Sequence, residues 1–164
     1  MPESICSRVA REAGLSPSDL ERLVGVARSA ADAGGQELMR HYGRLSSIKN
    51  KGRSGDLVTN ADLAAERIIL KLLAEQTPDI AVLAEESGAA GQQDGLRWCV
   101  DPLDGTTNFA HGYPFFATSI GLTFGQQPLL GAIAVPFLKE MYWGHRGSER
   151  SATTAPFRLS LIHI

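Results

Sequence analysis

The chain of 164 residues lacks the features typical of secreted, membrane-spanning and nucleic-acid-binding proteins. It has two cysteines, Cys6 and Cys99, too far apart for a CxxC motif, which argues against a disulfide framework and for a reducing, cytoplasmic setting. No apolar run is long enough to cross a bilayer, and the N-terminal stretch has no apolar centre typical of a secretory signal. The formal net charge of -2 provides no electrostatic basis for binding nucleic acid or an anionic membrane, and we expect neither as a partner.

Hydrophobic residues make up 43% of the chain, which is enough for one domain with a sizeable core. A first long helix is predicted to start at Ser16-Pro17-Ser18-Asp19, which offers an N-cap serine, a proline at the first helical position and an acid at the third. Gly34-Gly35 weakens the middle of this helix, and Gly43 is expected to end it.

A second helix is predicted to follow Thr59, with Asp62 at capping-box spacing, and to end at Thr77-Pro78. Between the two helices, residues 44–58 are polar and predict a loop or a short hairpin. The apolar positions of the second helix follow the i, i+3, i+4, i+7 pattern: Ala61, Ala64, Ala65, Ile68, Ile69, Leu72 and Leu73.

Short apolar or alternating runs separated by turn residues predict strands in the rest of the chain. Short connections favour antiparallel neighbours, and no alternation of strand and helix is present. The fold class that follows is α+β, with two long helices packed on one antiparallel sheet. The predicted strands cover residues 80–84, 97–100, 116–124, 129–135 and 140–143.

Acidic residues follow the first two predicted strands. Glu85-Glu86 closes one strand, and Asp101 and Asp104 follow the next, with only Pro102 and Leu103 between them. Carboxylates at strand ends that share a crevice repel one another unless a cation lies between them. Mg²⁺ prefers oxygen ligands and retains water for chemistry, and the backbone carbonyl of Leu103 could add a further oxygen.

The next residues, Gly105-Thr106-Thr107-Asn108, predict a helix start. Backbone N–H groups at such a position bind phosphate, and a glycine allows close approach. Carboxylates for a metal beside an anion-binding turn favour a phosphate-ester hydrolase. Taken residue by residue, other interpretations stay open: Asp62 as only a helix cap, Glu85-Glu86 as a solvated loop and Asp101–Asp104 as a plain turn.

Three motifs in order give the chain a resemblance to the inositol monophosphatase family of Mg²⁺-dependent phosphatases. GDLVTNAD (residues 55–62) is similar to the DxVTxxD element of that family, and LAEES (residues 83–87) resembles its GEES element with alanine at the glycine. WCVDPLDGTTNFAHGYPFFATSIGL (residues 98–122) resembles the most specific signature of the family. The resemblance implies a layered sugar-phosphatase fold, of which this chain would be the N-terminal part.

The resemblance also implies a set of metal ligands. Glu85, Asp101 and the Leu103 carbonyl resemble ligands of a first Mg²⁺ ion. Asp101 and Asp104 resemble ligands of a second ion. Through the metal, Glu85 belongs with the residues that take part in catalysis.

Substrate and water contacts are implied in the same way. Gly105 and Thr106 match residues whose backbone N–H groups hold phosphate, and Thr106 with Asp62 resembles the pair that orients the attacking water. Lys51 matches a lysine of a mobile metal loop better than Lys49 does, and Asp104 joins it as a substrate contact. The reaction implied is hydrolysis of a phosphomonoester, with inositol 1-phosphate first and histidinol phosphate or fructose 1,6-bisphosphate as alternatives.

The resemblance covers only the first half of the family pattern. The second half supplies another aspartate in a W-D-x-A motif, which this chain does not contain. We expect residues 1–146 to be the metal- and phosphate-binding part, and residues 147–164 to be an aberrant tail that follows a truncation or frame shift. A homodimer is expected for the full-length form, and a non-catalytic Mg²⁺-binding fragment is the alternative for this chain.

Overall fold

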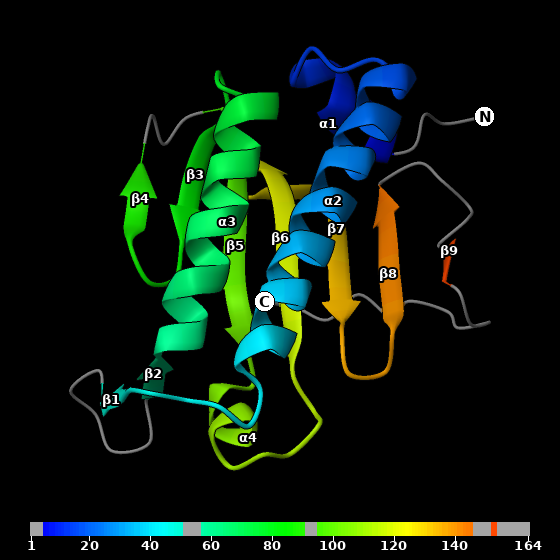
Figure 1. Ribbon diagram of the computed structural model, residues 1–164. Coiled ribbons are helices and arrows are strands. Elements are labelled where there is room, and N and C mark those ends of the chain that lie inside the picture. The colour runs from blue at the N-terminus through cyan, green and yellow to red at the C-terminus, as the bar shows by residue number, and fades with distance from the viewer. Residues whose placement is uncertain (1–4, 51–56, 91–94, 146–151, 154–164) are drawn as a thin grey trace.

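A computed structural model describes residues 5–50, 57–90, 95–145 and 152–153, which form an α+β structure of helices packed on a mixed sheet (Figure 1). The helices within these residues are α1 (Ile5–Glu12), α2 (Pro17–His41), α3 (Asn60–Gln76) and α4 (Thr106–Ala110). The strands are β1 (Ile48–Asn50), β2 (Leu57–Thr59), β3 (Ala81–Ala84), β4 (Gly88–Ala90), β5 (Leu96–Asp104), β6 (Ala117–Phe124), β7 (Gln127–Val135), β8 (Glu140–His145) and β9 (Ala152–Thr153).

Both long helices begin with the capping boxes that their sequences predict. Asp19 N–H donates to Ser16 Oγ, while Ser16 N–H donates to Asp19 Oδ2 at 2.9 Å, and these bonds with Ser16 lower the pKa of the Asp19 carboxyl. Thr59 and Asp62 form the same reciprocal arrangement at the start of α3. Such caps each stabilise a helix by about 1 kcal/mol, because they satisfy backbone N–H groups that have no partner within the helix.

The main sheet has the strand order β4-β3-β5-β6-β7-β8-β9. The expected antiparallel meander is confirmed from β5 to β8, whose neighbours pair antiparallel. The pair β3–β5 departs from it, because these two strands run parallel, with Ala84 opposite Val100. This is possible because β4 pairs with the outer edge of β3 before the chain re-enters the sheet as β5. As a result, β3 and β5 end at the same edge of the sheet.

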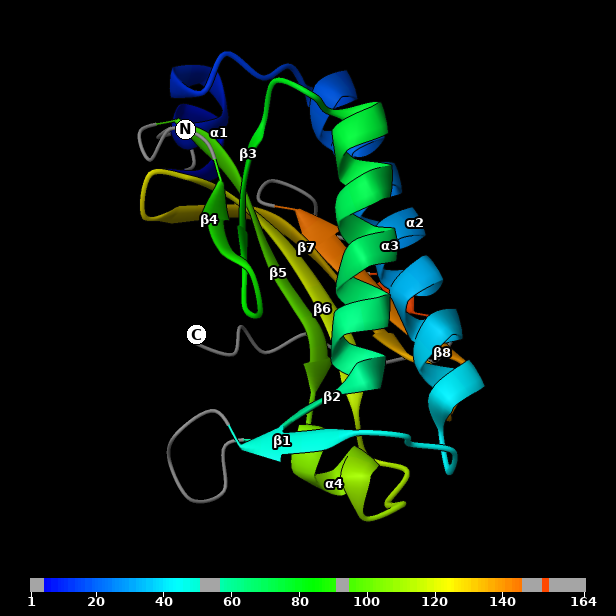
Figure 2. The same cartoon turned by 60° about the vertical axis from the view of Figure 1, so that its left-hand side comes forward.

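Helices α2 and α3 lie side by side on one face of this sheet (Figure 2). Gly34, which appeared to weaken α2, lies where the two helices and the sheet meet. A Cβ atom there would lie 2.7 Å from Ile69 Cδ1 and 3.0 Å from Thr118 Cγ2. Glycine therefore permits close packing of α2 against α3 and β6, which compensates for its low helix propensity.

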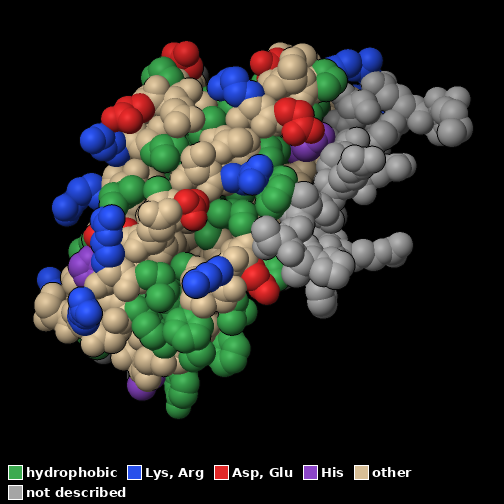
Figure 3. Space-filling view, turned by 45° about the vertical axis from the view of Figure 1, so that its right-hand side comes forward, with side chains coloured by type: hydrophobic (Ala, Val, Ile, Leu, Met, Phe, Trp, Pro, Cys, Tyr) green, Lys and Arg blue, Asp and Glu red, His purple; other side chains and the backbone are tan. Residues whose placement is uncertain are grey.

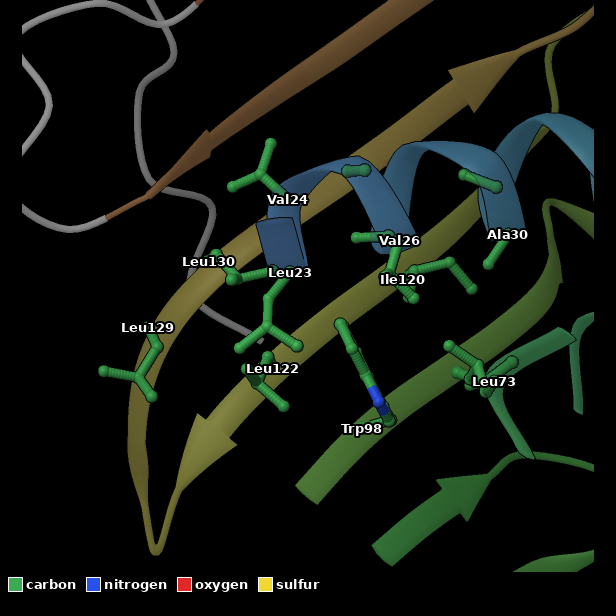
Figure 4. Packing of buried hydrophobic residues seen from close by; sticks show 14 of the residues in the cluster. Leu23, Val24, Val26, Ala30, Leu73, Trp98, Ile120, Leu122, Leu129 and Leu130 are labelled. Atoms are coloured by element: carbon green, nitrogen blue, oxygen red, sulfur yellow. The ribbon is translucent and has the colours of Figure 1, made fainter. Parts of the chain in front are cut away.

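The core lies between these helices and the sheet, around the fully buried Trp98 of β5 (Figure 4). The indole Nε1–H of Trp98 donates to Thr77 Oγ1 at 2.9 Å, and Thr77 Oγ1 donates to Leu73 O at 2.8 Å. The hydroxyl thus ends α3 and satisfies the buried indole. Surrounding apolar side chains include Leu23, Val26, Leu73, Ile120, Leu122 and Leu129.

A smaller apolar cluster lies at the end of the sheet where β5 leads into α4. Phe109 of α4 and Phe116 are in edge-to-face contact, with centroids 4.8 Å apart, and Tyr42 packs on both rings. Leu103 is also buried there, with Leu38 and Ala61 from the two long helices. This cluster fixes α4 against the starting turn of α3.

Two elements are only partly anticipated by the sequence. Helix α1 precedes the first predicted helix, and Val9 and Ala10 bury its apolar side in the core. Strands β1 and β2 pair antiparallel, with Ile48 opposite Thr59, so the hairpin alternative for residues 44–58 is the correct one for the described part. Within the described residues no helix is long and apolar enough to cross a membrane, and Cys99 is a free thiol.

The face shown in Figure 3 carries charges of both signs, with hydrophobic side chains gathered toward its lower end. Large exposed apolar side chains occur at the end of the molecule that carries α4. Tyr113 and Phe115 follow α4, and Phe137 and Leu138 lie in the β7–β8 turn. Tyr42 connects the two segments, because its hydroxyl donates to Gly112 O and its ring packs on Phe137.

Candidate active site

The parallel pairing of β3 and β5 brings Glu85 and Asp101 side by side. Each follows the last paired residues of the two strands, Ala84 and Val100, and Glu85 N–H continues the ladder by donating to Val100 O at 3.0 Å. The sequence analysis placed Asp101 after its strand, and this was wrong. Strand β5 continues to Asp104, with a register shift between Asp101 and Asp104 where it pairs with β6.

This irregular strand end is held by side chains. Thr118 Oγ1 donates to Pro102 O at 3.0 Å, and Leu103 N–H donates to Asp101 Oδ1 at 3.1 Å. Because Pro102 has no N–H, it cannot add a ladder bond, and β-bulges commonly re-aim side chains beside active sites. Pro102 and Leu103 are buried, while Asp104 is exposed.

The electrostatic environment raises the pKa of the Asp101 carboxyl to about 7. Burial is the largest cause, followed by the hydrogen bond and negative charge of Glu85 and then the charge of Asp104. The hydrogen bond from Leu103 N–H acts in the opposite direction. In the absence of a cation the three carboxylates therefore disfavour one another's ionised forms.

Asp62 is buried at the start of α3, with 1% of its surface exposed, and its two oxygens have separate partners. Oδ2 accepts from Thr59 N–H at 2.9 Å and from the Thr59 hydroxyl, which completes the helix cap. Oδ1 faces Thr106 Oγ1 at 3.2 Å. The cap therefore uses one oxygen and leaves the other for the second contact, so the two interpretations of Asp62 are compatible.

Thr106 joins α3 to the end of β5. Its Oγ1 lies 3.2 Å from Asp62 Oδ1 and 3.0 Å from Leu103 O, and it can donate its single proton to either. Asp62 and Thr106 are 44 residues apart in the chain, and the structure brings them together as the family resemblance implies.

Gly105 caps α4 in the left-handed region, at φ 88°. A Cβ atom there would lie 2.9 Å from Phe115 O, so glycine is required by both conformation and space. Asn108 Nδ2 donates to the same Phe115 carbonyl at 2.9 Å and fixes the loop that follows α4. The first backbone N–H groups of α4 have no partner within the helix, as at every helix start.

The remaining predicted site residues lie at the hairpin. Lys51 falls outside the described residues. Lys49 lies in β1 and is exposed. Asn60, which sequence reasoning missed, holds the approach to this hairpin, since its Oδ1 accepts from Ser46 N–H and Ser47 N–H, each at 3.2 Å.

Glu66 is a second residue that sequence reasoning missed. It is 4% exposed, and its Oε2 accepts a hydrogen bond from Glu86 N–H at 2.9 Å. Its signal in the sequence was available, because it lies four residues after Asp62, on the side of α3 that also carries Ala65 and Ile69. A charged residue at that position in an apolar helix face indicates a buried partner.

The donor chemistry of this edge fits a hard divalent cation. Glu85, Asp101 and Asp104 together raise the pKa of one carboxyl, which a nearby positive charge would reverse. In the described part of the chain no three His, Cys, Asp and Glu side chains stand as a ready-made ion cage. The carboxylates are therefore a partial set of ligands, which backbone carbonyls and water would complete.

Carboxylates at the ends of two parallel strands, next to a helix start and a buried Thr–Asp pair, define a class: layered α+β proteins whose site combines cation ligands with anion-binding backbone. The chain belongs to the inositol monophosphatase family, whose model matches residues 19–161. The match continues beyond residue 146, and the boundary expected there stays a prediction.

Relatives and solved structures agree with this assignment. The chain is 48% identical over 128 residues to an inositol-1-monophosphatase of Synechocystis, covering 77% of this chain and 45% of the relative. It is 40% identical to a fructose-1,6-bisphosphatase/inositol-1-monophosphatase of Aquifex aeolicus, covering 79% and 49%. The extragenic suppressor protein SuhB of Bartonella henselae superposes with a TM-score of 0.75 at 39% identity, covering 81% of this chain and 52% of that one. The chain thus spans about half the length of the curated relatives it matches.

Proposed function

We propose that this chain carries the metal- and phosphate-binding half of a Mg²⁺-dependent phosphomonoester hydrolase that acts on inositol 1-phosphate. The observation that carries the proposal is the Thr106 hydroxyl, which lies 3.2 Å from the buried Asp62 Oδ1 at the end of the carboxylate-bearing strand. A hydroxyl held against a buried carboxylate can orient a water molecule and pass a proton to it. The names of relatives supply the substrate class.

In this proposal Asp62 is the proton acceptor of the site. Its Oδ2 is held by the helix cap, so Oδ1 keeps a fixed position toward Thr106 Oγ1. Water approaching Thr106 Oγ1 would give a proton toward Asp62 through the hydroxyl, which donates to Oδ1 while its lone pair accepts from the water. The acceptor stays charged because the Thr59 N–H and hydroxyl donate to it.

Glu85, Asp101, Asp104 and the Leu103 carbonyl are the proposed metal ligands. Mg²⁺ at these oxygens would supply positive charge for the phosphate and acidify a nearby water. The raised pKa of Asp101 supports this role, because it reflects negative charge gathered without compensation. Glu85 and Asp101 would meet the ion from neighbouring parallel strands, as their adjacent positions allow.

The proposed phosphate site is the start of α4. Backbone N–H groups of Gly105 and Thr106 would donate to phosphate oxygens, and the glycine conformation at φ 88° exposes them. Lys51 and Asp104 are the proposed further contacts of substrate. Fructose 1,6-bisphosphate is the second candidate substrate, because the Aquifex relative carries both activities in its name.

The intact protein is proposed to be a cytoplasmic homodimer. The exposed apolar side chains Tyr113, Phe115, Phe137 and Leu138 support self-association through the end of the molecule that carries α4. Light scattering of the purified protein measures the oligomeric state, and a monomer at micromolar concentration would contradict this part of the proposal.

Phosphate release tests the activity. The chain is incubated with inositol 1-phosphate, fructose 1,6-bisphosphate or histidinol phosphate, with and without Mg²⁺. Thr106→Val, which removes the hydroxyl at constant shape, is compared with Thr107→Val, whose side chain is exposed one position along. We expect Mg²⁺-dependent release that Thr106→Val lowers by about a hundredfold and Thr107→Val leaves unchanged. Mg²⁺ binding without release would favour the non-catalytic fragment, and no binding at all would refute the metal site.

A further inference from the structure

Glu66 is a buried carboxylate with a partner in the segment that carries a proposed metal ligand. It lies one turn after Asp62 in α3, and its Oε2 accepts the backbone N–H of Glu86 at 2.9 Å. Burying a carboxylate is costly unless it is hydrogen-bonded, and a bond from N–H to a charged oxygen is among the stronger hydrogen bonds in proteins. The contact therefore fixes Glu86 relative to α3.

The residue before it, Glu85, is fixed from the other side. Glu85 N–H donates to Val100 O of β5 at 3.0 Å, as an extension of the parallel ladder. Two successive N–H groups are thus anchored, one by the sheet and the other by a helix side chain. The peptide between these anchors determines where the Glu85 side chain leaves the backbone, opposite Asp101.

We propose that Glu66 is a positioning residue that sets the Glu85 carboxylate against Asp101 and thereby raises the affinity of this edge for Mg²⁺. The role in metal affinity rests on the proposed function, whereas the Glu66–Glu86 contact does not. Groups that orient ligands in this way typically change metal affinity by about 10- to 100-fold. Glu66 itself is not proposed as a ligand, since its oxygen is directed to a backbone N–H.

The experiment compares four variants of the full 164-residue chain. Glu66→Gln keeps an acceptor oxygen at the same distance along the side chain. Glu66→Met removes the acceptor at similar size. Glu66→Asp keeps the charge but withdraws it by one methylene, and it provides a second test if Glu66→Met fails to fold. Glu75→Gln is the matched control, because Glu75 is an exposed carboxylate of the same helix, paired only loosely with Lys71 at 3.9 Å.

Two measurements are made on each variant. Isothermal titration with Mg²⁺ alone gives the dissociation constant, and amide hydrogen exchange in metal-free buffer gives the protection of Glu86 N–H. We expect Glu66→Met and Glu66→Asp to raise the dissociation constant about 10- to 100-fold and to speed exchange at Glu86. Glu66→Gln should stay within about threefold of the unchanged chain, and Glu75→Gln should equal it.

The outcomes separate this inference from the proposed function. If the unchanged chain binds no Mg²⁺, the proposed metal site and the positioning role both fail. If it binds Mg²⁺ and Glu66→Met binds equally well, only the positioning role is overturned. Equal weakening by Glu66→Gln and Glu66→Met would also overturn it, because the effect would then follow the charge rather than the hydrogen bond to Glu86.

Discussion

The middle of the sheet and the edge where β3 and β5 end are built on opposite principles. In the middle, Trp98 is fully buried, and its only polar atom is satisfied by Thr77. At the edge, Asp101 lies near Glu85 and Asp104, and its pKa is raised to about 7. The same strand, β5, contributes both residues. The middle is arranged for stability, whereas the edge gathers charges that the fold alone does not compensate, which is typical of functional sites.

This comparison predicts the largest loss of stability at Trp98. Trp98→Ala should lower the free energy of unfolding by about 3–5 kcal/mol, because it leaves a cavity and removes the donor to Thr77. Urea unfolding followed by circular dichroism measures the change. Trp143→Ala is the control, because Trp143 is half-buried and packs under Arg28 at 3.8 Å, so a smaller loss is expected there. A loss below about 1 kcal/mol at Trp98 would contradict the assigned core.

The next largest effect is expected on function, at Asp101. Asp101→Asn should lower Mg²⁺-dependent phosphate release by at least about a hundredfold, because an amide replaces a charged ligand. In metal-free buffer the same variant should unfold at a higher temperature, because burial and the charges of Glu85 and Asp104 oppose the ionised carboxyl. Asp79→Asn, at an exposed position, should leave both quantities unchanged. A lower unfolding temperature for Asp101→Asn would show that the edge does not carry uncompensated charge.

Gly105 provides a smaller effect with an internal control. Gly105→Ala should cost about 1–2 kcal/mol in stability from the left-handed conformation alone, with more from the contact of Cβ with Phe115 O. Gly112 has a similar φ of 75° and open space around it, so Gly112→Ala should show the conformational cost alone. Thermal unfolding and inorganic phosphate binding measure the two effects. Equal losses of phosphate binding in both variants would contradict a specific anion site at Gly105.

The smallest effect is expected at Asn60, at the border between packed helix and hairpin. Asn60→Ala should cost about 1 kcal/mol, because it removes the acceptor for Ser46 N–H and Ser47 N–H. Asn60→Asp keeps an acceptor oxygen but loses the amide that faces His41 Nδ1 at 3.0 Å, and it should cost less. Hydrogen exchange at Ser46 and Ser47 reports the change. Unaltered protection in Asn60→Ala would contradict the contact.

Local features of the fold were predictable because they depend on neighbours in sequence. The capping boxes at Ser16 and Thr59, the glycine that opens α4 and the strand alternation of residues 117–124 all involve residues within four positions of each other. The motifs identified the acids of the site for the same reason, since each motif is a short continuous run. Helix α1 carried no capping signal strong enough to predict it.

Contacts between distant segments were not predictable from these patterns. Short connections favour antiparallel strands, so nothing local indicated that β4 would intervene and leave β3 parallel to β5. The partner of Glu66 is 20 residues away, and it became apparent only once α3 was packed against the end of β3. Gly34 looked like a weak point until its contacts with Ile69 and Thr118 were in view.

By itself, the sequence determined which residues carry the chemistry: Asp62, Glu85, Asp101, Asp104, Gly105 and Thr106, each in a recognisable short motif. Only the tertiary structure decided how they meet. Parallel pairing places Glu85 beside Asp101, and packing of α3 gives Asp62 one oxygen for its cap and one for Thr106. The physical reason is that helix caps and turns form between neighbours in the chain, whereas opposed carboxylates and a buried hydroxyl–carboxylate pair exist only where the core forces distant segments together.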